Sequence, residues 1–100
     1  MDEHYLFEHL SGFYTTGVYS ELVKGDKLFR GNAVKSVERK STFSWEATII
    51  PRSREFHISI EVNEKSTISG CSCKSITTHL CRHKAAALLA ILQSLSFEGD

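Results

Sequence analysis

Three cysteines and two histidines lie within thirteen consecutive positions, in the segment CSCKSITTHLCRH at 71–83. Cys71 and Cys73 form one close pair, and Cys81 and His83 form a second, so the spacing is C-x-C-x7-C-x-H. Structural zinc sites take four ligands in a tetrahedron, and three thiolates with one imidazole are a common set. The spacing therefore predicts one structural Zn²⁺ ion, bound by Cys71, Cys73, Cys81 and His83.

Other chemistries explain the same residues less completely. A Cys71–Cys73 disulfide would close a very small, strained ring and leave the second pair unexplained. A Cys81–His83 nucleophile pair needs a substrate cleft and an orienting group, which the sequence does not show. A catalytic zinc would keep an open coordination position, whereas four ligands are available here. His79 is an alternative fourth ligand, but His83 makes the two pairs symmetric and lies at the start of a predicted helix.

The first ligand pair is expected to follow a strand. Apolar residues alternate with polar ones in two runs, which predicts half-buried strands; these are Phe43, Trp45, Ala47 and Ile49, then Phe56, Ile58, Ile60 and Val62. Turn-forming segments at 51–55 and 63–65 make neighbouring strands antiparallel. AVKSV at 33–37 is expected to open this sheet, and Ile68 lies on a short segment that leads into Cys71.

The second ligand pair is expected to open a helix over 82–95. Its apolar arc comprises Leu88, Leu89, Ile91, Leu92 and Leu95, and the opposite side comprises Ala86, Ala90, Gln93 and Ser94. Residues 1–32 read as short helical pieces interrupted by glycines, with Gly31-Asn32 as the final stop. Tyr14 and Tyr19 could be base-stacking platforms, but core positions are the favoured interpretation.

These elements predict an α+β fold in a single domain spanning 1–100. It divides into a helical lead-in at 1–32, an antiparallel β-meander at 33–70, and a zinc finger with its helix at 71–95. The longest apolar run has eight residues, at 85–92, so no membrane span is expected. Three cysteines cannot all pair as disulfides, which favours a reducing compartment and hence the cytoplasm. The short tail after Leu95 fits a fragment of a longer protein.

Charge is unevenly distributed along a chain whose formal net charge is zero. Residues 1–26 carry five acidic residues and one basic residue, whereas residues 27–57 carry seven basic residues and three acidic ones. The candidate phosphate contacts in this basic segment are Lys35, Arg39, Lys40, Arg52 and Arg54. Strong nucleic-acid binders usually have a basic overall balance, so a solvated strand surface is the competing interpretation.

The C-x-C-x7-C-x-H spacing, followed by KAAALLAIL, resembles the SWIM zinc finger, and a looser similarity extends over residues 20–95. The resemblance implies zinc binding by Cys71, Cys73, Cys81 and His83, and contact with DNA or a protein partner. Such modules accompany bacterial Swi/Snf-type helicase-like ATPases, transposases, and some kinases and ubiquitin ligases. The chain lacks a P-loop, so we expect a noncatalytic accessory region without a small-molecule substrate. A pure protein-interaction adaptor and a thiol enzyme are the alternatives.

Overall fold

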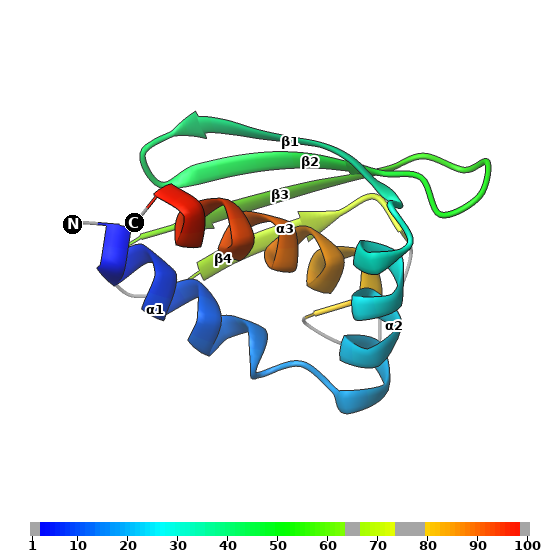
Figure 1. Cartoon of the computed structure of the whole chain (residues 1–100), viewed down its shortest axis with the longest axis horizontal. Coiled ribbons are helices and arrows are strands. Elements are labelled where there is room, and N and C mark those ends of the chain that lie inside the picture. The colour runs from blue at the N-terminus through cyan, green and yellow to red at the C-terminus, as the bar shows by residue number, and fades with distance from the viewer. Residues whose placement is uncertain (1–2, 64–66, 74–79, 99–100) are drawn as a thin grey trace.

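A computed structural model describes residues 3–63, 67–73 and 80–98, and this part of the chain forms three helices and one four-stranded antiparallel sheet (Figure 1). The α+β prediction is confirmed. In chain order the elements are α1 (Glu3–Tyr14), α2 (Tyr19–Arg30), β1 (Val34–Ser41), β2 (Ser44–Ile49), β3 (Phe56–Val62), β4 (Thr67–Cys71) and α3 (Arg82–Glu98).

The sheet is a meander with strand order β1-β2-β3-β4, and its alternating sequence separates a buried face from an open one. The buried residues of the two central strands are Trp45, Ala47, Ile49, Ile58, Ile60 and Val62. Trp45 lies opposite Ile60, and Ala47 lies opposite Ile58. Because side chains opposite one another project from the same face, the period-two pattern fixes this register. Both strand predictions are confirmed.

Strand β1 is longer than predicted and is irregular at both ends. Its pairing with β2 shifts register between Val34 and Ser36, and again between Arg39 and Ser41. Lys35 and Lys40 are therefore extra residues, each at a β-bulge in the outer strand.

Helix α3 lies against the buried face of the sheet, and both N-terminal helices pack against it (Figure 1). Its buried residues are Ala85, Ala86, Ala87, Leu88, Ile91 and Leu95. Ala86 lies on the side opposite the apolar arc, as predicted, but that side is buried as well. Because α3 is covered by helices as well as by the sheet, small alanines are needed where another backbone approaches.

That close approach involves Gly25, which sequence analysis treated as a helix interruption. Gly25 is instead a buried residue inside α2. A Cβ atom at this position would lie 2.5 Å from the Cβ of Ala85 and 2.9 Å from the carbonyl oxygen of Arg82. The absence of a side chain at Gly25 therefore lets α2 pack directly on the first turn of α3.

The predicted stop after α2 is confirmed, although asparagine rather than glycine adopts the left-handed conformation. Asn32 has a φ of 62°, a region that asparagine tolerates better than most residues. Tyr14 packs half-buried against the core, as predicted. Tyr19 begins α2 at the corner after α1 and is 80% exposed, so its predicted core position is wrong. In the described part of the chain, no helix combines the length and hydropathy needed to cross a membrane.

Candidate metal centre

The end of β4 and the start of α3 bring the four predicted ligands together. Strand β4 points toward the end of the molecule where α3 begins (Figure 1). The ligand atoms of Cys71, Cys73, Cys81 and His83 all lie within 4.8 Å of one another. Ligands at zinc distances of about 2.0–2.3 Å in a tetrahedron lie about 3.5–3.8 Å apart. A small inward adjustment thus suffices, and the cluster could hold a metal ion.

The first ligand pair lies on a turn that is anchored to β3. The backbone N–H of Cys73 donates to the Sγ of Cys71 at 3.5 Å, which orients that sulfur. Between them, Ser72 donates its backbone N–H to the carbonyl oxygen of His57 at 3.0 Å. Its hydroxyl oxygen in turn accepts the backbone N–H of His57 at 2.9 Å. Ser72 thus extends the β3–β4 pairing by one residue and holds the turn in place.

The second ligand pair begins α3, and Cys81 occupies its N-cap position. Its carbonyl oxygen accepts the N–H of Ala85 at 2.9 Å, the first helical hydrogen bond. Its sulfur is hydrogen-bonded by the backbone N–H of Lys84. A side-chain acceptor at the N-cap that bonds this N–H satisfies one of the free donors of the first turn. The helix terminus therefore favours the thiolate form of Cys81.

A carboxylate from α2 completes the same helix terminus. One oxygen of Glu21 accepts the backbone N–H of Arg82 at 3.3 Å, and the other accepts its guanidinium at 3.2 Å. Glu21 is largely buried, since only 15% of its side chain is exposed. The residue between the two C-terminal ligands is thereby tied to α2. The guanidinium of Arg82 is therefore directed at Glu21.

His83 is held by an aromatic ring from β3. The Phe56 and His83 ring centroids lie 4.0 Å apart with an angle of 21° between the planes, a stacked arrangement. The guanidinium of Arg54 lies 5.2 Å from the centroid of Phe56. The Nδ1 atom of His83 lies 3.9 Å from the Sγ of Cys81, so this nitrogen faces the cysteines. Stacking restricts rotation of the imidazole and keeps Nδ1 directed at the cluster.

The cysteine sulfurs interact strongly with one another. A hydrogen bond with Cys71 lowers the pKa of Cys81 to about 3, helped by His83 and the Lys84 N–H and opposed by burial. The same hydrogen bond, followed by burial, raises the pKa of Cys71. The pair therefore releases its first proton easily and holds the second tightly. A cation among the sulfurs would remove that barrier, because a metal ion stabilises several adjacent thiolates.

His79, the alternative fourth ligand, lies outside the described part of the chain. Three further residues at the site were not identified from the sequence: Glu21, Phe56 and Ser72. Ser72 lies inside the ligand motif, between Cys71 and Cys73, so its position in the sequence could have indicated a role at the site. Glu21 and Phe56 are remote in sequence from Arg82 and His83, and no local spacing connects them.

The five predicted phosphate contacts are all exposed, but they do not form one surface. Lys40 is held by Glu38 at 3.2 Å and Glu46 at 3.3 Å, and these hydrogen bonds raise its pKa, Glu38 contributing most. Arg39 lies 5.1 Å from the Trp45 ring centroid and donates to the carbonyl oxygen of Thr42. Both residues belong to the end of β1 that leads into β2.

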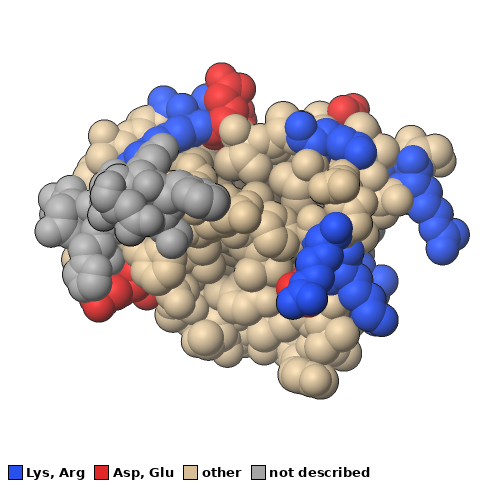
Figure 2. Space-filling view, viewed as in Figure 1, with Lys and Arg blue, Asp and Glu red and all other residues tan. Residues whose placement is uncertain are grey.

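The other three candidates, Lys35, Arg52 and Arg54, lie toward the opposite end of the sheet. Lys35 follows the first residue of β1, and the two arginines lie between β2 and β3. Figure 2 shows Lys and Arg side chains in separate groups on the visible face rather than in one continuous patch. The basic segment of the sequence is thus divided between two ends of the fold.

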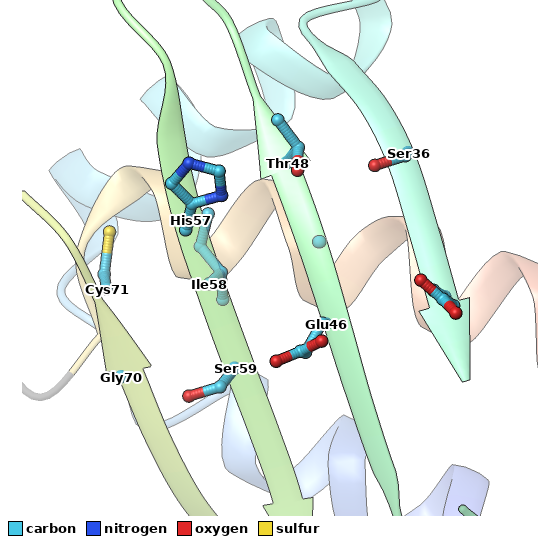
Figure 3. Close-up of a pocket in the computed structure, with 10 residues that line it drawn as sticks. Ser36, Glu46, Thr48, His57, Ile58, Ser59, Gly70 and Cys71 are labelled. Atoms are coloured by element: carbon cyan, nitrogen blue, oxygen red, sulfur yellow. The ribbon is translucent and has the colours of Figure 1, made fainter. Parts of the chain in front are cut away.

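The open face of the sheet carries a polar hollow of about 400 Å³ (Figure 3). Glu46 and Ser59 project into it from neighbouring strands, with His57 and Thr48 farther along. Glu38 also lines it. Because Lys40 binds both of these carboxylates, the hollow offers hydroxyls and partly neutralised acids rather than free cations.

Comparison of the chain with protein-family models, with curated proteins and with solved structures finds no match in any of the three. The site geometry is compatible with a CxCxnCxH zinc finger, and the ligand spacing carries that resemblance.

Proposed function

We propose that this chain is a SWIM-type module stapled by one structural zinc ion. The observation that carries the proposal is the convergence of three sulfurs and one imidazole within 4.8 Å. Thiolate and imidazole ligands in this ratio favour Zn²⁺ over the oxygen-preferring Mg²⁺ and Ca²⁺. Four protein ligands leave no position for a reactive water, which supports a structural role. The proposal assigns the chain no catalytic residue and no small-molecule substrate.

Metal titration of the reduced, metal-free protein tests this assignment. We expect Co²⁺ to bind at one ion per chain, with the absorption of tetrahedral thiolate coordination, and Zn²⁺ to displace it. His83→Gln should abolish that spectrum, whereas His79→Gln, the matched control, should preserve it. Absence of tetrahedral binding would contradict the zinc site. Loss of the spectrum only in the His79 variant would show that His79, and not His83, is the fourth ligand.

We further propose that the module binds nucleic acid as an accessory region of a larger helicase-like ATPase in the cytoplasm. Its support is the similarity of the ligand motif to SWIM fingers and the presence of exposed cations without an ion pair in the described residues. Lys35 and Arg52 are two of these. Binding that weakens steeply as salt rises is the expected result, because phosphate contacts release counterions.

A protein-interaction adaptor is the second candidate. It is favoured by the open sheet face, where carboxylates rather than free cations line the hollow. If the zinc-loaded chain binds neither single-stranded nor duplex DNA at low salt, the nucleic-acid function is wrong and the adaptor is the better account.

A further inference from the structure

We propose that the nucleic-acid contact surface lies on the exposed side of α2 and the adjoining start of β1, formed by Lys24, Lys27, Arg30 and Lys35. The ligand is the phosphate backbone of a nucleic acid. This inference rests on the proposed nucleic-acid function and assigns it a place in the fold. Three of these residues are absent from the candidates that the sequence indicated.

The first observation is a row of cations along α2. Lys24, Lys27 and Arg30 follow one another at three-residue intervals, so they lie along one side of the helix, and all three are exposed. Gly25 marks the side that packs on α3. The row spans about 9 Å along the helix axis at about 1.5 Å per residue. That length matches two to three phosphates of a strand with a rise of about 3.4 Å per nucleotide.

The second observation is the availability of these charges. Among the described residues, Lys24, Lys27 and Lys35 form no ion pair. Arg30 pairs with Asp26 at 3.0 Å, but 78% of its side chain is exposed, so this contact is weak. Figure 2 shows Lys and Arg side chains gathered where Figure 1 places α2. The surface therefore offers positive charge that the protein itself leaves largely unused.

The third observation is continuity between α2 and β1. A hollow of about 310 Å³ joins the end of α2 to the start of the strand, and its lining includes Phe29, Asn32, Val34 and Lys35. Gln93 of α3 also borders it. Because Lys35 is the extra residue of a β-bulge, its side chain is not constrained by pairing with β2. Lys35 thus borders a hollow that begins at Phe29, the residue before Arg30, and places a fourth positive charge beyond the end of α2.

The charges on the open face of the sheet argue against binding of the nucleic acid there. The open sheet face exposes Glu38, Glu46 and Glu61, while Lys40 is occupied by the first two. Carboxylates facing a polyanion would repel it. A strand bound through α2 and Lys35 avoids that face, whereas one bound through Arg39 and Lys40 would border it.

Fluorescence anisotropy with the zinc-loaded full chain tests the surface. The probes are a labelled single-stranded oligonucleotide and the corresponding duplex, titrated between about 50 and about 200 mM salt. We expect Lys24→Gln/Lys27→Gln to weaken binding about tenfold at low salt and to reduce the salt slope by about two on duplex. The matched control, Arg39→Gln/Lys40→Gln, also removes two charges and should change the affinity less than about twofold. The Co²⁺ spectrum and melting temperature establish that each variant is folded.

A variant with the opposite effect strengthens the test. Asp26→Asn removes the carboxylate beside Arg30 and should tighten binding and steepen the salt dependence. Wild-type binding that survives Lys24→Gln/Lys27→Gln unchanged would overturn this surface while leaving the nucleic-acid function standing. Loss of binding in the Arg39→Gln/Lys40→Gln control alone would show that the contact surface lies at the β1–β2 end instead. No binding by the wild-type chain would reject the nucleic-acid function itself, and metal titration would still report on the zinc site independently.

Discussion

The first turn of α3 and the remainder of that helix are held in place by different forces. The first turn lies among cysteines, a carboxylate and a stacked histidine. It contacts Ser69 of β4 and Glu21 of α2 through hydrogen bonds, and Phe56 of β3 through ring stacking. Farther along, Leu88, Ile91 and Leu95 are buried against apolar neighbours. Apolar burial thus holds the body of the fold, whereas one end of it is held by polar and ring contacts around a cluster that could bind a metal ion.

Of the variants considered, Cys81→Ser should separate the two regions most clearly, by weakening the first turn of α3 while leaving the rest of the helix in place. The substitution removes a ligand and the N-cap sulfur together, so we expect Zn²⁺ affinity to fall by more than about 100-fold. Competition with a chelator measures that loss. Retention of most helical circular dichroism is expected, since Leu88 and its neighbours stay buried. Global unfolding on metal removal would show that the body of the fold also depends on the ion.

Leu88→Ala makes the complementary change. Leu88 is fully buried, and truncation at such a site costs about 2–5 kcal/mol in the free energy of unfolding. Denaturant titration should show this loss with and without metal. The Co²⁺ spectrum of the folded variant should be unchanged, and a marked loss of metal affinity would mean that the two regions are not separable.

Gly25→Ala tests the junction between the regions, where α2 meets the first turn of α3. The added Cβ would lie 2.5 Å from that of Ala85, so we expect a net loss of about 1–2 kcal/mol despite the better helix propensity of alanine. Gly12→Ala is the matched control, because nothing lies within 4 Å of its added Cβ. That variant should gain about 0.5–1 kcal/mol. Equal effects at both glycines would contradict the close packing.

Phe56→Leu should have the smallest effect, confined to the metal. Leucine keeps apolar bulk but cannot stack on His83, so we expect Zn²⁺ affinity to fall by up to about tenfold. Phe43→Leu, a partly buried phenylalanine just before β2, is the control and should leave metal affinity unchanged. Equal affinities for the wild type and the Phe56 variant would show that stacking does not position the ligand.

Local patterns in the sequence were sufficient to predict the sheet and the four residues that cluster as candidate metal ligands. Alternation around Trp45 and Ile60 predicts both central strands, and the close spacing of Cys81 and His83 reflects a local geometry. Contacts between distant segments carry no such pattern. The pairing of Glu21 with Arg82 and the stacking of Phe56 on His83 follow from the chain topology, which periodicity does not specify.

The same reason explains the errors. The burial of Ala86, opposite the apolar arc, was not foreseen because a helical pattern shows how apolar residues are distributed, but not how many elements cover the helix. Tyr19 was expected in the core because its neighbours are apolar, yet it begins α2 at an exposed corner. The charge of Lys40 was counted as available although Glu38 lies two residues before it, and its second partner, Glu46, is brought close by strand register rather than by local sequence.

The two bulges of β1 have a consequence for how molecules of this protein meet in concentrated solution. An outer strand with a regular backbone offers its free N–H and C=O groups to the strand of a neighbouring molecule, which is a route to aggregation. Here the backbone departs from regular pairing at Lys35 and Lys40, and both side chains are exposed. Only a short regular stretch remains between two positive charges, so this border of the sheet resists the growth of intermolecular β-structure.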